Sequence, residues 1–565
     1  MKEENKRSII DSLYKIYKDE TKVSMAFQMI DKKFCESVDK EEYNEWLSEK
    51  DSMLITYGDT LQDEGKTSLE ALHDFLVKYV GKAISSVHLL PMFPYTSDDG
   101  FSVIDYKTIN PELGSWEDIN NLATDYKLMF DGVINHISKS SEWFQKFLTC
   151  EEPYKDYFIV ADPNGDYSKV VRPRALPLLT PFDTAEGNKY VWTTFSEDQI
   201  DLNFKSVNVL IEILDVLITY AKNGAKFIRL DAIGFLWKED NTKCMHLPET
   251  HEVVKLIRKV LDIYAPGTKI ITETNVPHKE NISYFGNNND EAHLVYQFPL
   301  PPLVMFTLLK GNATKLANWV KSLESLESNT TYFNFLSSHD GIGIRPTEGI
   351  LTDEERELLI DTTLRNGGEV SYKDNGDGTK SPYELNINYQ DALAGAEDSD
   401  EIRIKRFLAA ETILLSLQGM PGIYIHSLLG SRNDYYGKTI SGIPRRINRG
   451  KLYVNKLESA LNGDTNRRII FEKIIRILNI RKTHSAFSPV ASQEILELDP
   501  RVFGLIRNNQ VTGEIIYVLI NVSNKDITLD VKDLEGMDLL SGNEIQAKIT
   551  LNPLQSMWIQ FGHKL

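Results

Sequence analysis

The chain has 565 residues, a mass of 64.5 kDa and an ordinary globular composition, with 41% hydrophobic and 26% charged residues. Its formal net charge of −19 argues against a nucleic-acid-binding or anionic-membrane surface, because both need clustered cationic side chains. The N-terminal residues lack the apolar core of a secretory signal, and no apolar run is long enough to span a bilayer. We therefore expect a cytoplasmic protein.

Residues 1–52 are highly charged and have a mostly helical pattern, from ENKRSIIDSLYKIYKDE to EEYNEWLSEKD. We interpret this segment as an appended helical extension, either a cap or a dimer element, that takes no part in the chemistry. One of three cysteines, Cys35, falls in it. With Cys150 and Cys244 it makes a set too small and too scattered for a disulfide framework or a zinc site.

From residue 53 to about residue 485, eight short apolar runs alternate with segments of helical period, such as 208–223 and 250–267. The runs are continuously apolar, which indicates strands buried on both faces, as in a parallel sheet. Eight βα units fit a closed (β/α)₈ TIM barrel, and an open doubly wound sheet is the alternative. The eight runs are residues 53–58, 85–91, 127–134, 226–232, 269–275, 293–298, 332–338 and 422–427.

Two connections are too long for a plain repeat, at about 137–200 and 341–400. Long loops inside a compact barrel usually form the mouth of a site, so we expect both insertions there. From residue 486 to residue 565 the pattern alternates, as in EIIYVLINVS, which predicts a small C-terminal antiparallel β domain.

Acidic side chains end three of the predicted strands: Asp231, Glu273 and Asp340. The carboxyl ends of barrel strands form the active-site face, and two carboxylates at one mouth suit glycoside chemistry. The alternative is that each acid only caps the helix that follows its strand. Further polar residues fall at or just after strand ends: Asp98, Asp131, Asn135, His136, Arg229 and His339.

Two of these acids have contrasting surroundings. Arg229 lies two residues before Asp231, so strand alternation points both side chains to one side, where the arginine would keep Asp231 ionised as a nucleophile requires. A plain interior ion pair is the alternative. Glu273 follows the apolar run KIIT, and partial burial would raise its pKa towards the range of an acid/base catalyst.

Four ordered motifs resemble the conserved regions of the α-amylase superfamily, glycoside hydrolase family 13. Several further stretches are similar to its sucrose phosphorylase subfamily, and within that to the glucosylglycerate phosphorylases, which share the helical N-terminal extension. The four motifs are FDGVINH (130–136), FIRLDAIGF (227–235), ITETN (271–275) and FLSSHDGIG (335–343). The subfamily stretches include SDDGFSVIDY (97–106), RPRALPLLTPF (172–182), LLGSRNDYYG (428–437) and RRINR (445–449).

This resemblance implies a role for each matching residue. Asp231 would be the nucleophile that forms a β-glucosyl-enzyme, Glu273 the acid/base, and Asp340 the stabiliser of the transition state. Two inversions give net retention, with the first two carboxyls expected about 5–5.5 Å apart. Residues matching those that hold the glucose ring are Asp98, His136, Arg229, His339 and Arg445, with Phe101 and Phe195 as aromatic neighbours.

Phosphate and acceptor residues are implied in the long loops. Arg174 and Tyr383 match phosphate-contacting positions, and arginine forks suit phosphate oxygens. Glu384 stands where sucrose phosphorylases typically have glutamine, which argues against sucrose and suits the hydroxyls of a small polyol acceptor. A glycerate carboxylate would need a cation, for which Arg432 and Lys438 are candidates, unless they are solvated surface charges.

The resemblance therefore implies a phosphorylase that converts 2-O-α-glucosylglycerate and phosphate to α-D-glucose 1-phosphate and D-glycerate. Glucosylglycerol, sucrose and sucrose 6′-phosphate are alternative donors. A hydrolase or transglucosidase, and a catalytically inactive binding subunit, are alternative functions. Inorganic phosphate is expected as co-substrate, with no cofactor. Although Asn135 matches an amylase calcium ligand, the subfamily does without the ion, so no metal is expected. Sucrose phosphorylases are often dimers, which suggests a homodimer.

Overall fold

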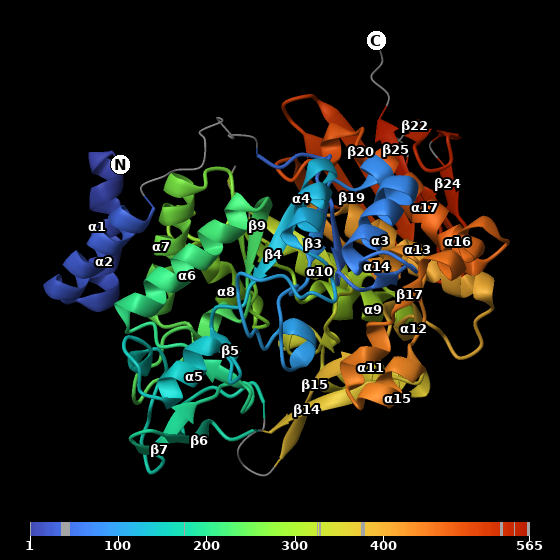
Figure 1. The fold of residues 1–565 in the computed structure, drawn as a ribbon. Helices are drawn as coiled ribbons and strands as arrows, with labels where there is room; N and C mark the ends of the chain where they lie inside the picture. The colour runs from blue at the N-terminus through green and yellow to red at the C-terminus, as the bar shows by residue number, and fades with distance from the viewer. Residues whose placement is uncertain are drawn as a thin grey trace.

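The central part of the molecule is a closed barrel of eight parallel strands (Figure 1). The computed structural model describes residues 2–34, 46–174, 176–324, 326, 329–374, 379–531, 535–546 and 548–561. The barrel confirms the predicted (β/α)₈ fold over the open sheet, and each predicted run supplies one strand. The strands are β1 (Met53–Thr56), β3 (Ser86–Leu89), β4 (Lys127–Gly132), β9 (Ala225–Leu230), β10 (Lys269–Thr272), β11 (Leu294–Tyr296), β12 (Thr331–Phe335) and β16 (Met420–Tyr424).

The barrel strands follow one another in the ring in chain order, and β16 closes it between β12 and β1. Every residue of β1, β3, β12 and β16 is buried, which is why these runs are mostly apolar, with only a few buried polar residues such as His88 and Asn334. β9 lies between β4 and β10, and its Arg229 is in register with Asp131 of β4. Neighbouring strands therefore bring their polar C-terminal residues to the same end of the barrel.

Helices surround the barrel and bury their apolar faces against it. Both predicted helices are present, as α6 (Val207–Lys222) and α7 (Pro248–Tyr264). Helix α3 (Ser68–Phe75) begins with a capping box in which Thr67 and Glu70 satisfy each other's backbone N–H groups. Further helices are α4 (Trp116–Asp125), α8 (His278–Asn281), α9 (Leu300–Lys310), α10 (Thr314–Lys321), α13 (Asp400–Ser416), α14 (Ile425–Leu428), α15 (Tyr435–Ser441), α16 (Val454–Asn462) and α17 (Asn466–Arg481).

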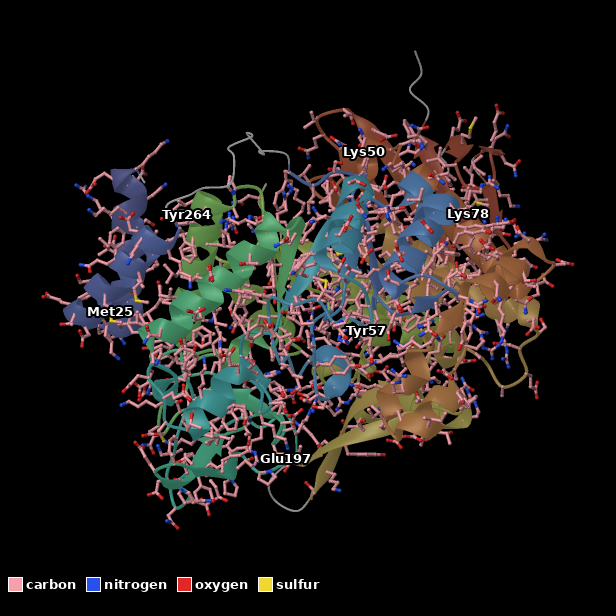
Figure 2. The ribbon with its side chains drawn as sticks, in the orientation of Figure 1. Met25, Lys50, Tyr57, Lys78, Glu197 and Tyr264 are labelled. Carbon is pink, nitrogen blue, oxygen red and sulfur yellow. The ribbon has the colours of Figure 1, made fainter. Side chains whose placement is uncertain are left out.

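The N-terminal segment forms a helical hairpin of α1 (Glu3–Tyr17) and α2 (Glu20–Lys33), which lies against α6 and α7 (Figure 1). Lys259 of α7 donates a hydrogen bond to Ser12 Oγ at 2.7 Å, and Phe34 contacts Tyr264 with ring centroids 5.6 Å apart. Figure 2 shows Tyr264 on the side towards the hairpin and Met25 at the outer edge of the molecule. Cys35 lies outside the described residues.

Both long insertions carry structure of their own and lie at the same lower edge of the molecule in Figure 1. The first contains β5 (His136–Ser138), α5 (Glu142–Leu148), β6 (Leu179–Thr184), β7 (Gly187–Trp192) and β8 (Gln199–Asp201). The second contains β13 (Ile342–Gly343), α11 (Asp353–Arg365), β14 (Glu369–Asp374), β15 (Lys380–Asn386) and α12 (Tyr389–Ala392). Strands β13, β15 and β14 form a small antiparallel sheet.

The predicted C-terminal antiparallel domain is confirmed as a six-stranded sheet in the order β18-β19-β20-β25-β22-β23, beside the pair β21-β24. It is anchored to α13, because the indole N–H of Trp558 donates to Ser416 Oγ at 2.8 Å. The strands are β18 (Ser492–Ile495), β19 (Val502–Asn509), β20 (Glu514–Asn521), β21 (Ile527–Asp530), β22 (Gly536–Asp538), β23 (Glu544–Ile545), β24 (Lys548–Leu551) and β25 (Ser556–Phe561).

A short parallel pair, β2 (Leu61–Gln62) with β17 (Leu452–Tyr453), ties the loop after β1 to the chain before α16. Across the described ranges, the chain holds no helix with the length and apolar character needed to cross a bilayer.

Candidate active site

Arg229 is the central charge at the C-terminal end of the barrel. Its side chain is 3% exposed, and its Nη1 donates to Asp231 Oδ1 at 2.8 Å and to the carboxylate of Asp131. Its Nη2 lies 3.9 Å from Glu273 Oε2. One buried guanidinium therefore contacts or faces carboxylates from three neighbouring strands, and fixes where they lie relative to one another.

The backbone after β9 links two of these acids directly. Ala232, which follows Asp231, has a left-handed φ of 47°, an uncommon conformation for a residue with a side chain. Its N–H donates to Glu273 Oε2 at 3.0 Å. The turn after Asp231 therefore also orients Glu273. The backbone strain of this turn lies within the site itself.

Burial raises the pKa of both acids, and charged neighbours modify each shift. Burial raises the pKa of Glu273 to about 7, and the nearby Asp231 and Asp340 carboxylates reinforce the effect against Arg229. Burial also raises the pKa of Asp231, while Arg229 and His136 oppose this shift. Glu273 is thus suited to giving and taking a proton near neutral pH, as the sequence predicts from the apolar run before it.

Asp340 is a further carboxylate of the pocket, and Arg445 holds it ionised. Arg445 Nη1 lies 2.7 Å from Asp340 Oδ1. Burial alone would raise the pKa of Asp340, but Arg445, with smaller contributions from His339, Arg449 and Arg229, lowers it well below its usual range. A carboxylate kept charged in this way suits electrostatic stabilisation of a cationic transition state.

Two histidines, His136 and His339, line the pocket as neutral groups. Burial lowers the pKa of His136, and its Nε2–H donates to the backbone oxygen of Phe101 at 2.9 Å. Burial and two arginines lower the pKa of His339 to about 3, and its ring stacks on Phe101 with centroids 4.9 Å apart. Both rings therefore offer hydrogen bonds without adding charge.

At the mouth of the site, Arg174 and Asp98 form an ion pair with Nη2 and Oδ2 2.9 Å apart. Burial alone would raise the pKa of Asp98, but Arg174, Arg445 and Arg449 together lower it to about 2. The Arg174 guanidinium also lies 5.8 Å from the centroid of the Phe195 ring. Its side chain is 36% exposed, so it can reach a ligand entering from solvent.

Glu384 is bound by a double fork rather than free. Arg445 donates from Nε to Glu384 Oε1 at 2.8 Å and from Nη2 to Oε2 at 2.6 Å. Glu384 is 3% exposed on β15, whereas Arg445 lies on the short helix η8 (Pro444–Asn448). Arg445 is thereby shared between Asp340 and Glu384, and this arrangement sets its direction in the pocket.

The structure brings thirteen of the fourteen predicted site residues to the lining of one pocket. Their assigned roles remain predictions. The thirteen are Asp98, Phe101, His136, Arg174, Phe195, Arg229, Asp231, Glu273, His339, Asp340, Tyr383, Glu384 and Arg445.

Comparison with known proteins agrees with this geometry. The family model described as alpha amylase, catalytic domain, matches residues 76–349. A glucosylglycerate phosphorylase from Allomeiothermus silvanus is 50% identical over 517 residues, covering 91% of each chain. Another from Escherichia coli is 46% identical, covering 91% of this chain and 92% of its own. This chain belongs to the glucosylglycerate phosphorylase family, within the α-amylase superfamily.

A solved structure extends the relationship to a neighbouring specificity. The sucrose 6F-phosphate phosphorylase from Thermoanaerobacter thermosaccharolyticum has a TM-score of 0.75 and 25% identity, covering 90% of this chain and 99% of its own. The same fold is therefore found in a phosphorylase whose name gives a different substrate.

One predicted site residue of this phosphorylase-family chain does not reach the pocket. Arg432 is 48% exposed and donates from Nε to Asp391 Oδ1 at 2.5 Å, on the loop after α14. Lys438 pairs with Glu369 on β14 at 2.5 Å and also lies outside the pocket lining. Because Asp391 binds Arg432 outside this lining, nothing in the pocket geometry supports its assignment to the acceptor site, which stays a prediction.

Gln199 and Asn275 are among the pocket residues that the sequence left unassigned. Gln199, at the start of β8, donates to the Phe101 backbone oxygen at 3.0 Å and lies 3.4 Å from Asp98 Oδ2. Asn275 also lines the pocket, and within the part of the chain that the structure describes its buried Oδ1 has no hydrogen-bond partner. Asn275 ends the motif ITETN, two residues after Glu273, so the strand-end position was a usable signal. Gln199 carried none.

Proposed function

We propose that this chain is a retaining phosphorylase that converts 2-O-α-D-glucosylglycerate and inorganic phosphate to α-D-glucose 1-phosphate and D-glycerate. The observation that carries the proposal is the pairing of Glu273, whose pKa is raised to about 7, with Asp231, which Arg229 holds at 2.8 Å. The relatives at 46% and 50% identity are glucosylglycerate phosphorylases, which supports this donor.

In the first step Asp231 attacks C1 of the glucosyl group and forms an ester bond, while the bond from C1 to the glycerate oxygen breaks. Glu273 gives its proton to that oxygen, so D-glycerate leaves as a neutral alcohol at this position. Positive charge develops on the ring in the transition state. Asp340, kept ionised by Arg445, lies in the pocket to stabilise it.

In the second step a phosphate oxygen attacks C1 and the ester to Asp231 breaks. Glu273, now ionised, takes the proton of the incoming phosphate, which returns both carboxyls to their starting states. Two inversions at C1 give an α-configured product. No metal, cofactor or redox step is needed in this sequence, so inorganic phosphate is the sole co-substrate that we propose.

Phosphate must compete with water at this second step, and Arg174 is the cation that we assign to it. Arg174 lies half-buried at the mouth of the pocket, where it forms an ion pair with Asp98. Arg445 is shared between Asp340 and Glu384, and Arg229 is enclosed by acids, so both are committed to other partners. An arginine fork matches phosphate oxygens and a glycerate carboxylate alike.

The acceptor is tested by running the reaction in reverse. Phosphate release from α-D-glucose 1-phosphate is measured with D-glycerate, glycerol, D-fructose, fructose 6-phosphate or no acceptor. The Asp231→Asn variant at equal concentration gives the background. We expect release that depends strongly on D-glycerate.

The other possible results contradict either the acceptor or the phosphorylase chemistry. Release with glycerol or a fructose compound keeps the phosphorylase chemistry and replaces the acceptor. Equal release with no acceptor makes water the partner and turns the enzyme into a hydrolase. The homodimer expected from the family resemblance remains a prediction, which light scattering at several protein concentrations tests.

A further inference from the structure

Arg449 lies behind the pocket and is not part of its lining, yet it joins two of the loops that form it. Its side chain is 1% exposed. Its Nη1 donates to Asp99 Oδ2 at 2.6 Å, in the loop after β3. Its Nε donates to the backbone oxygen of His339 at 2.7 Å, in the loop after β12.

The loop after β3 has a backbone that needs external support. Asp98 and Asp99 both have left-handed φ values, 55° and 46°, followed by Gly100 at 108°. A residue with a side chain is strained in this conformation and persists there only where its surroundings hold it. Gly100 is required, since a Cβ there would lie 2.9 Å from the backbone oxygen of Pro91. This turn points Asp98 into the pocket, whereas Asp99 points to Arg449.

The loops held by Arg449 carry four residues of the predicted glucose subsite. Asp98 and Phe101 lie on one loop, and His339 and Asp340 on the other. On the pocket side, the rings of Phe101 and His339 stack with planes 8° apart. On the far side, the guanidinium of Arg449 joins the same two loops, so they are connected both in front and behind.

We propose that Arg449 and Asp99 are positioning residues, whose ion pair holds the strained Asp98–Asp99 turn and the His339–Asp340 loop in the relative position that binds the glucose ring. This inference rests on the proposed glucosyl transfer, because it concerns the same subsite. Neither residue is assigned any contact with the sugar.

The remaining contacts of Arg449 support the same role. Its Nη2 lies 4.0 Å from Asp340 Oδ1 and has no hydrogen-bond partner among the described residues. Its guanidinium carbon lies 5.7 Å from the ring centroid of Tyr57, which Figure 2 labels near the middle of the molecule. Arg449 also contributes to lowering the pKa of both Asp98 and Asp340. The aromatic ring and the acids on the two loops therefore attract the Arg449 guanidinium to the position between them.

The test uses α-D-glucosyl fluoride, whose reaction requires neither glycerate nor phosphate, so it separates this proposal from the choice of acceptor. Fluoride release is measured for wild type, Asp99→Asn, Arg449→Met and the double variant. Asparagine keeps the size of Asp99 and tolerates a left-handed backbone, so this variant removes mainly the charge. The inhibition constant of D-glucose is measured for each variant.

We expect each single variant to lose about 10- to 100-fold in kcat/KM, the scale of a misplaced subsite. D-glucose should bind correspondingly less tightly. The double variant should be no worse than the poorer single variant, because both changes remove one interaction. Arg449→Lys, which keeps a cation but not the fork, should recover part of the loss.

Arg446→Met is the matched control, since Arg446 Nη1 lies 3.4 Å from the other Asp99 oxygen with a side chain that is 22% exposed. It should change kcat/KM by less than about 3-fold, as more exposed pairs contribute little. Additive losses in the double variant would overturn the proposal. So would a lower kcat with unchanged KM and D-glucose inhibition, because that marks only a smaller folded fraction, which thermal unfolding checks. Wild type that fails to release fluoride would instead contradict the proposed glucosyl transfer itself.

Discussion

The floor and the rim of the pocket are built on different principles. The floor, defined as Arg229, Asp231 and Glu273, lies at the ends of β9 and β10, where neighbouring strands fix the spacing of the side chains. The rim, defined as Arg174, Tyr383 and Glu384, lies on the two long insertions. The barrel sheet therefore positions the groups to which we assign bond making and breaking, while loops position the groups to which we assign partner selection.

This difference explains how relatives with different acceptors share one fold. The sucrose 6F-phosphate phosphorylase matches 90% of this chain at 25% identity. Changes on an insertion alter the rim without moving a barrel strand. Variants in the floor should therefore affect every reaction of the enzyme, and variants in the rim only some of them.

The largest effect is expected at the floor, from Asp231→Asn. An amide forms no glycosyl ester, so turnover should fall by at least ~10⁴-fold with every acceptor, as for other removed nucleophiles. Steady-state phosphate release with D-glycerate measures this. Asp262→Asn, an equal change on the outer helix α7, is the control and should leave turnover unchanged. Substantial phosphorolysis by the Asp231→Asn variant would remove Asp231 from the nucleophile role.

Glu273→Gln should lower turnover of glucosylglycerate by ~10²- to 10⁴-fold and spare the fluoride donor, whose leaving group needs no proton. In wild type, the first step needs protonated Glu273, so its rate should fall as pH rises through about 7. This fall should disappear in the variant. The measurement is the rate of the first step by stopped flow, as a function of pH and with both donors. If Glu273→Gln slowed this step equally with both donors, the acid role would be contradicted.

The same carboxyl should affect stability. Its pKa is raised on folding, so the native state binds more protons than the unfolded state between the ordinary glutamate pKa and about 7. Wild type therefore loses stability as pH rises through that window. Glu273→Gln lacks this loss, so its melting temperature should exceed that of wild type at pH 8, and the gap should close below about pH 5. A gap that stays constant with pH would contradict the assignment.

At the rim, Arg174→Ala should weaken phosphate use by about 10- to 100-fold, the scale of one lost charge-assisted contact, and leave hydrolysis of the same donor nearly unchanged. The ratio of glucose 1-phosphate to glucose formed is the measurement. Arg174→Lys, which keeps the charge without the fork, should lie between the two. Equal losses in both reactions would show that Arg174 supports only the structure.

The smallest effect is expected from Arg432→Ala, because Arg432 is outside the pocket lining and paired with Asp391. The KM for D-glycerate should change by less than about 2-fold, as for other half-exposed ion pairs. A large increase in this KM would bring Arg432 back as the carboxylate-binding residue and would place part of the acceptor site beyond the rim.

The sequence by itself determined the barrel, the C-terminal sheet and the floor of the site. Barrel strands carry a local signal, since both of their faces are buried and most residues of the run must be apolar. Their polar ends then converge because parallel strands end on one face, as Asp231 and Glu273 do.

Only the tertiary structure decided which charges pair with one another at the rim and behind it. Glu384 binds Arg445 across 61 residues of chain, and Asp99 binds Arg449 across 350. Arg432 looked equally available in sequence and is bound instead by Asp391. Such pairs depend on how separate loops pack against one another. A local sequence pattern cannot predict them, because the identity of a charged residue does not specify its partner.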